Sequence, residues 1–104
     1  MHRQQRVDLH VHTVASEGAL TMSNQFAYAR GAGLSSIAIT DRDVLPDIDE
    51  GRALSRRYNV HFIPGVELSV GWEGNEIHLL AYNVDCGNRF LKAHLARAAR
   101  LIAE

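Results

Sequence analysis

The chain has 104 residues, of which 46% are hydrophobic and 22% are charged. This composition is typical of a globular protein, and the length suits one domain or part of a larger one. The net charge of −1 at pH 7 argues against a broad nucleic-acid-binding face, which usually makes a domain strongly basic. A nucleotide substrate remains compatible with this charge, because metal ions can supply the positive charge.

The cysteine content and the N-terminal residues predict the compartment. Cys86 is the only cysteine, so the chain forms no internal disulfide and fits a reducing compartment. The first six residues are polar and lack the apolar core of a secretory signal. No segment is apolar for long enough to span a membrane. We therefore expect a cytoplasmic protein without a membrane partner.

The first predicted element is a strand over residues 6–12, because apolar and polar residues alternate there. The alternation places three apolar side chains on one face of the strand: Val7, Leu9 and Val11. Three polar side chains then share the other face: Asp8, His10 and His12. Small and polar residues at positions 13–20 predict a loop after this strand.

A helix, a strand and a second helix are predicted next. The first helix is capped by Thr21 or Ser23 and ends at residues 31–33, where two glycines stop it. Residues 34–40 read as a short and mostly buried strand. The second helix covers residues 48–58.

The last third of the chain contains two strands and a helix. A third strand over residues 60–63 is predicted to break at Pro64-Gly65 and to continue as an extended arm. A hairpin turn at residues 72–76 leads to a fourth strand over residues 77–84. Residues 89–104 form a helix with one broad apolar face. Strands that alternate with helices at this spacing predict an α/β fold with βαβ units and a parallel sheet.

Polar side chains gather where the predicted strands end. His10 and His12 close the first strand, the run Asp41-Arg42-Asp43 follows the second, and Glu67 follows the third. His78 lies early in the fourth strand. Because the carboxyl ends of parallel strands meet at one edge of a sheet, we expect these groups to lie close together.

The pair His10 and His12 has the spacing of a metal site on a strand. Two histidines at positions i and i+2 point the same way, and Glu67 from a neighbouring strand end would complete a mixed nitrogen and oxygen shell. Such a shell suits Zn²⁺, Mn²⁺ or Fe²⁺. Ordinary surface or core histidines also occur at this spacing. The recurrence of ligand-type residues at successive strand ends favours the metal site.

Four stretches of the sequence, in order, resemble the motifs of one superfamily. Residues 8–18 (DLHVHTVASEG) resemble a motif in which Asp-x-His-x-His-Thr is followed by Ser-Asp-Gly, and residues 39–43 (ITDRD) resemble Thr-Asp-His-Asp. Residues 63–69 (IPGVELS) and 76–80 (EIHLL) resemble the next two motifs. Together they make the chain similar to the PHP (polymerase and histidinol phosphatase) superfamily of metal-dependent phosphoesterases. The residues of these motifs are most similar to those of the subgroup that acts on nucleoside bisphosphates and short RNA ends.

The resemblance implies a distorted (β/α)₇ barrel. Residues 1–104 would be a partial PHP domain, the N-terminal half of that barrel, with about four strands and three helices. A complete β/α barrel usually needs about 250 residues, which is far more than this chain has. The other half would come from another copy of the chain in a homo-oligomer, or from the C-terminal part of a longer protein.

The resemblance also implies a centre of up to three divalent ions. His10 and His12 would hold the first ion, and Glu67 would bridge it to a second ion that His78 also binds. Glu17 would reach a third ion. The implied reaction is the hydrolysis of a phosphomonoester, in a small phosphorylated substrate such as a nucleotide or a short RNA end, by a metal-activated hydroxide.

Asp8 and Asp41 would then orient the histidines or bound water. Two positions depart from the superfamily pattern. Arg42 stands where a metal-binding histidine is usual, and a guanidinium cannot coordinate a cation. Glu17 replaces an aspartate, which keeps the carboxylate but lengthens its reach. With these departures, we expect the centre to bind between one and three ions. Arg42 either contacts a substrate phosphate or marks the loss of a metal ligand.

Two functions therefore remain open from the sequence. The first is a metal-dependent phosphoesterase. The second is a truncated and non-catalytic PHP module that binds metal or nucleotide, or that only self-associates.

Overall fold

The computed structural model describes the backbone of residues 5–103 and the side chains of residues 5–97. In chain order, the elements are β1 (Val7–Val11), α1 (Met22–Gly31), β2 (Ser36–Ile39), α2 (Ile48–Tyr58), β3 (His61–Trp72), β4 (Asn75–Tyr82) and α3 (Arg89–Ala103). The prediction of four strands and three helices is confirmed. The predicted last residue of the final helix, Glu104, lies outside the described residues.

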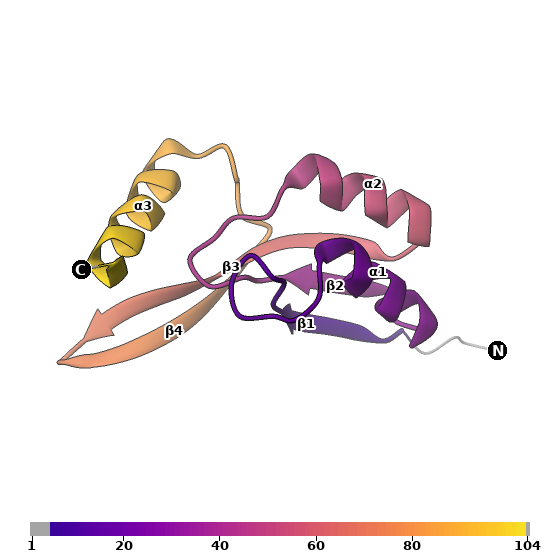
Figure 1. Cartoon of the computed structure of the whole chain (residues 1–104), viewed down its shortest axis with the longest axis horizontal. Coiled ribbons are helices and arrows are strands. Elements are labelled where there is room, and N and C mark those ends of the chain that lie inside the picture. Colours follow the sequence, from indigo (N-terminus) through magenta and orange to yellow (C-terminus); the bar gives the residue numbers. More distant parts are fainter. Residues whose placement is uncertain (1–4, 104) are drawn as a thin grey trace.

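The four strands form one sheet in the order β1-β2-β3-β4 (Figure 1). β1 pairs with β2, and β2 with β3, in parallel as predicted, whereas β3 and β4 are antiparallel. The antiparallel pairing of β4 agrees with the hairpin turn that the sequence predicts at residues 72–76. The two-residue turn Glu73-Gly74 reverses the chain directly. Both turn residues have positive φ, 50° and 79°, as a tight hairpin turn of this kind requires.

β1 does not keep the predicted alternation. Val11 is buried, but Val7 and Leu9 are 52% and 43% exposed. The residues of β2 that pair with Asp8 and Val11 are only two positions apart, so β1 carries one extra residue between them. Such a bulge interrupts the period of two. The prediction that Val7, Leu9 and Val11 share one face is therefore wrong, and the irregularity lies beside the histidine pair.

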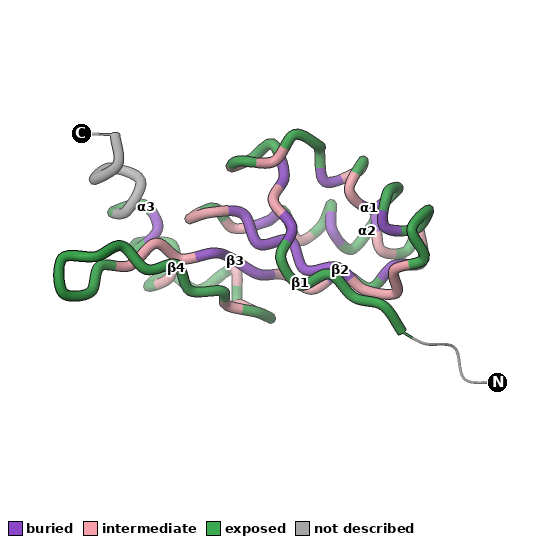
Figure 2. The backbone as a smooth tube through the Cα atoms, turned by 90° about the horizontal axis from the view of Figure 1, so that it is seen from below, coloured by how far each residue is buried: buried purple, intermediate pink, exposed green. Residues whose placement is uncertain are grey.

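α1 and α2 cover one face of the sheet, and the core lies between them and the strands (Figure 1). Phe26 of α1 and Leu54 of α2 pack there against the sheet residues Ile37, Ile39 and Phe62. Figure 2 shows buried backbone in β2 and in the first part of β3. Because burial of apolar surface is the main stabilising term, this layer fixes the strand ends relative to each other. It therefore positions the site.

Both core helices begin where the sequence predicts. The Thr21 side chain accepts a hydrogen bond from Asn24 N, and the Asp47 side chain accepts one from Glu50 N. Gly33 follows α1 with φ 78°, a conformation that favours glycine. None of the helices within residues 5–103 is long and apolar enough to cross a lipid bilayer.

β3 runs through Pro64 and Gly65 without the predicted break. Pro64 pairs with Ile39 at the last step of the parallel ladder, and its carbonyl accepts a hydrogen bond from Val84 N at 3.4 Å. A Cβ atom at Gly65 would lie only 2.8 Å from Ala81 O, so glycine permits the close approach of β4. Proline suits extended backbone although it lacks a donor. The dipeptide marks the point where β3 changes from a parallel to an antiparallel partner.

The face of the sheet opposite α1 and α2 carries exposed apolar side chains. Leu80 and Tyr82 lie on the same face as Glu67, because they pair with Glu67 and Gly65 across the hairpin. They are 38% and 39% exposed. The Tyr82 hydroxyl donates a hydrogen bond to the Leu9 carbonyl at 2.7 Å. This contact joins β4 to β1, the two outer strands, so the sheet curls toward this face.

Candidate metal centre

Three side chains that the sequence predicts as metal ligands meet beside the end of β1: His10 lies near this end and His12 directly follows it, whereas Glu67 lies within β3 and does not follow it as predicted. His10 Nε2 lies 2.6 Å from Glu67 Oε1, and His12 Nε2 lies 3.6 Å from the same oxygen. The two imidazole rings meet edge to face, with centroids 5.0 Å apart. One ligand atom from each of the three residues lies within 4.8 Å of the other two. The strand-end argument therefore predicted a real cluster, and the role of its members as ligands stays a prediction.

Glu67 is the buried charge of this cluster. Its side chain is 4% exposed. Burial alone would raise the pKa of Glu67, but hydrogen bonds to Arg42 and His10 outweigh burial and hold the pKa below its ordinary value. Glu67 is therefore negatively charged at neutral pH, as a cation ligand must be.

The donor atoms of the cluster fit a divalent transition-metal ion. His12 Nε2 is buried and has no hydrogen-bond partner among the described residues. A buried polar nitrogen without a partner is costly, so a ligand at this atom would relieve the cost. Two imidazoles and one carboxylate form the mixed shell that suits Zn²⁺, Mn²⁺ or Fe²⁺. Three protein ligands also leave positions open for water or substrate.

Arg42 lies among the other predicted ligands. It follows β2 and forms an isolated bridge with Glu67, which brings its side chain to the cluster. Its Nη1 atom lies 2.5 Å from Glu17 Oε1, and its Nε atom donates to Glu67 Oε2 at 3.2 Å. Its Nη2 atom donates to His78 Nδ1 at 3.4 Å. The hydrogen bond to Glu67 raises the pKa of Arg42, so the guanidinium is a permanent cation at the site.

Asp8 and Asp41 shape the backbone near the histidines. Asp41 is 2% exposed, and its carboxylate accepts hydrogen bonds from Thr13 N at 2.6 Å, Thr13 Oγ1 at 2.7 Å and Ser16 Oγ at 2.6 Å. Asp8 accepts one from His10 N at 3.1 Å. In the described part of the chain, neither carboxylate hydrogen-bonds an imidazole ring. Both carboxylates bind backbone or hydroxyl groups here, and their role in orienting the histidines or bound water stays a prediction.

Two acidic residues near the site were given no role from the sequence: Glu76, and Asp43 of the run that follows the second strand. Glu76 Oε1 lies 3.4 Å from His78 Nε2. The two residues are two positions apart on β4 and share a face, a signal that the sequence offered. Asp43 accepts a hydrogen bond from Ser69 N at 2.9 Å, and its other oxygen is buried without a partner among the described residues. The only indication in the sequence that Asp43 lies near the site was its position after β2.

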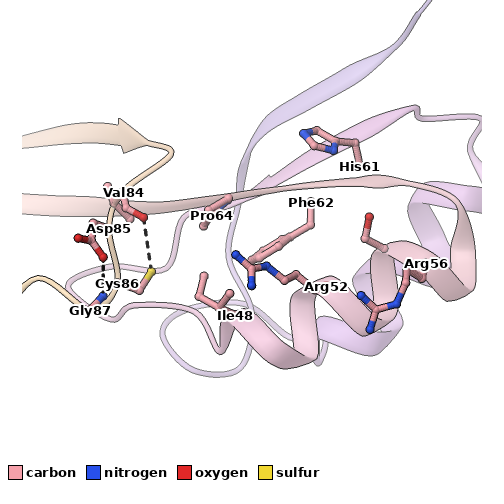
Figure 3. A pocket seen from close by; sticks show the side chains of 11 residues that line it. Ile48, Arg52, Arg56, His61, Phe62, Pro64, Val84, Asp85, Cys86 and Gly87 are labelled. Carbon is pink, nitrogen blue, oxygen red and sulfur yellow. Dashed lines mark hydrogen bonds between the residues drawn. The ribbon is translucent and has the colours of Figure 1, made fainter.

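A separate cavity of about 640 Å³ lies between α2, β3 and residues 84–87 (Figure 3). Ile48, Arg52, His61 and Phe62 are among the residues that line it. No side chain of the metal cluster lines this cavity. The metal chemistry therefore does not belong there, although the cavity is large enough for a small molecule.

Comparison with known proteins identifies the family of the chain. Residues 8–98 match the model of the PHP domain. The chain belongs to the PHP family. A solved structure of a protein described as a metal-dependent phosphoesterase, from Bifidobacterium adolescentis, shares this fold with a TM-score of 0.85 and 33% sequence identity. The match covers 96% of this chain and 36% of that one, so the four strands and three helices are the N-terminal half of a distorted PHP barrel.

Two curated relatives of this PHP chain act on nucleic acid or nucleotides according to their names. The 5'-3' exoribonuclease Rnm of Salmonella typhimurium is 37% identical, and the match covers 93% of this chain. The 3',5'-nucleoside bisphosphate phosphatase of Chromobacterium violaceum is 33% identical over 86% of this chain. The matches cover 36% and 31% of those relatives. This PHP chain thus spans about a third of the length of the curated relatives it matches.

Proposed function

We propose that the chain carries the N-terminal part of a metal-dependent phosphoesterase centre that hydrolyses phosphomonoesters of nucleotides or short RNA ends. The meeting of His10, His12 and Glu67 carries this proposal, together with the buried His12 Nε2, which has no hydrogen-bond partner among the described side chains. The names of the exoribonuclease and phosphatase relatives support the substrate class. The proposal treats the chain as a partial PHP domain that works in the cytoplasm, with the rest of the barrel supplied by a longer protein or a second copy.

Two strands contribute the ligands of the proposed metal site. His10 and His12 hold the ion from β1, and Glu67 holds it from β3. A bound Mn²⁺, Zn²⁺ or Fe²⁺ ion supplies positive charge to the phosphate oxygens and lowers the pKa of water. Asp41 keeps the loop after β1 in place through its bonds to Thr13, so the position of His12 is set before substrate arrives.

A non-catalytic module is the second candidate function. It is favoured by the ion pairs of Arg42 with Glu17 and Glu67, which engage two of the predicted ligands. In this case, the chain binds metal or nucleotide without turnover.

The decisive experiment measures metal content and phosphate release on the same purified chain. We expect bound transition metal, and metal-dependent release of phosphate from a nucleoside 3',5'-bisphosphate that stops on chelation. His10→Ala and Glu67→Ala should each lower metal affinity by at least tenfold, because they remove a direct ligand. His94→Ala is the matched control, since His94 is exposed on α3 away from the cluster.

The outcomes separate the two candidates. Turnover that is lost on chelation and in both ligand variants supports the phosphoesterase. Metal binding without turnover, in this chain and when it is mixed with the remainder of a barrel, supports the module. A chain that binds no transition metal, or whose metal content is unchanged in Glu67→Ala, overturns the proposed centre.

A further inference from the structure

Arg42 holds the position that further metal ions would need. Its guanidinium contacts Glu17 through Nη1, Glu67 through Nε and His78 through Nη2. Three of the five side chains that the sequence predicts as metal ligands therefore meet one covalently attached cation. The remaining two, His10 and His12, do not contact the guanidinium by any described hydrogen bond.

The donor atoms around the guanidinium are engaged. Glu17 Oε1 forms an ion pair with Arg42 Nη1, Glu67 Oε2 accepts a hydrogen bond from Arg42 Nε, and His78 Nδ1 lies 3.4 Å from Arg42 Nη2. A guanidinium has no lone pair to offer a metal ion. A divalent cation placed among these atoms would also lie within a few ångströms of a permanent positive charge, which is strongly unfavourable where water is partly excluded.

The other side of Glu67 remains open. Its Oε1 atom faces His10 and His12, whereas its Oε2 atom faces Arg42. Within the described residues, His10, His12 and Glu67 are the group of His, Cys, Asp and Glu side chains that could hold an ion. The carboxylate thus lies between the ligand atoms of His10 and His12 on one side and the guanidinium of Arg42 on the other.

We infer that this centre binds a single divalent ion, at His10, His12 and Glu67, and that the guanidinium of Arg42 takes the place of the additional ions among Glu17, Glu67 and His78. The inference deepens the proposed function and rests on it for the first ion. The tethered cation compensates Glu17 and Glu67 at all metal concentrations, and Arg42 is a positioning residue for Glu67.

The test counts the ions bound per chain, which needs no turnover. The wild-type chain is equilibrated with Mn²⁺ or with Zn²⁺, and bound metal is counted by elemental analysis and by calorimetric titration. We expect one ion per chain. Arg42→His removes the guanidinium and adds a donor, so we expect at least one additional ion per chain.

Two further variants guard against misfolding and nonspecific effects. Glu17→Gln should still bind one ion with affinity within about threefold of wild type, because Glu17 Oε1 pairs with Arg42 and its Oε2 lies 4.0 Å from His12 Nδ1, not from the Nε2 atom that faces Glu67. Arg52→Ala should also bind one ion, since Arg52 is an exposed arginine that lines the separate cavity. Far-ultraviolet circular dichroism and melting temperature confirm that each variant is folded.

The result separates the inference from the proposed function. Two or more ions on the wild-type chain, loss of the ion in Glu17→Gln, or a folded Arg42→His variant that still binds one ion overturns the inference and leaves the phosphoesterase proposal standing. Absence of any bound ion on the wild-type chain overturns both.

Discussion

Asp41 is a buried carboxylate whose three described hydrogen bonds all go to the loop after β1. Asp41→Asn replaces one acceptor oxygen by an NH₂ group that faces other donors. We expect this variant to lower the free energy of unfolding by about 1–3 kcal/mol, because a buried group is left without a partner. Urea denaturation followed by circular dichroism measures the change.

The control for this variant is Asp49→Asn, an exposed residue in the first turn of α2. It should cost less than about 1 kcal/mol, the size of a helix-dipole contribution. Hydrogen exchange at Gly18 N, which donates to Thr13 O, should also become faster in Asp41→Asn. Equal stability of Asp41→Asn and wild type would show that these bonds do not hold the loop.

At the scale of single residues, the sequence predicted which side chains meet but not how they meet. His10, His12 and Glu67 could be identified because ligand-type residues recur where β1 and β2 end, and Glu67 of β3 lies beside the residues that follow β2. The contacts of Arg42 could not be predicted, because the direction of its long side chain depends on residues of three other segments of the chain. The same limit applies to Asp41, whose partners depend on the path of a loop.

At the scale of elements, Gly51 shows how closely α2 lies on the sheet. A Cβ atom at Gly51 would overlap the Phe62 ring, with Cδ2 only 2.7 Å away. We expect Gly51→Ala to destabilise the fold, because overpacking costs about 1–3 kcal/mol. The better helix propensity of alanine offsets about 1 kcal/mol of this cost.

Gly31→Ala at the end of α1 is the matched control, since no atom lies within 4 Å of the added Cβ. It should be neutral or stabilising by up to about 1 kcal/mol. Urea denaturation of both variants gives the comparison. If Gly51→Ala is as stable as Gly31→Ala, the helix and the Phe62 ring can move apart freely, and the tight packing is not a constraint.

The helices were the elements that the sequence predicted best. Their caps, Thr21 and Asp47, act within one turn of chain, so local sequence determines where they begin. The bulge in β1 and the continuity of β3 were missed because both depend on partner strands. Gly65, for example, is needed for the approach of β4, which a reading of residues 60–65 alone cannot show.

At the scale of the whole molecule, the Tyr82 hydroxyl connects the two outer strands of the sheet through its bond to the Leu9 carbonyl. Tyr82→Phe removes only this bond. We expect a loss of about 0.5–1.5 kcal/mol in the free energy of unfolding, the usual net value of one hydrogen bond. Tyr28→Phe is the control, because Tyr28 is 68% exposed and its hydroxyl makes no described hydrogen bond.

Both tyrosine variants are compared by urea denaturation, and hydrogen exchange along β1 reports whether the edge of the sheet loosens. Faster exchange in Tyr82→Phe alone fits a bond that maintains the curl. Identical behaviour of the two variants would mean that the curl comes from strand twist and packing instead.

The order of the strands has a consequence for folding. His10 belongs to β1 and Glu67 to β3, with β2 between them, and the two residues are 57 positions apart in the chain. An ion shared by these side chains is a removable cross-link between strands that are not neighbours. By chain entropy alone, closing a loop of this length is worth about 4 kcal/mol. Because ligand binding stabilises the native state by mass action, the free concentration of the ion would set the fraction of chains that are folded.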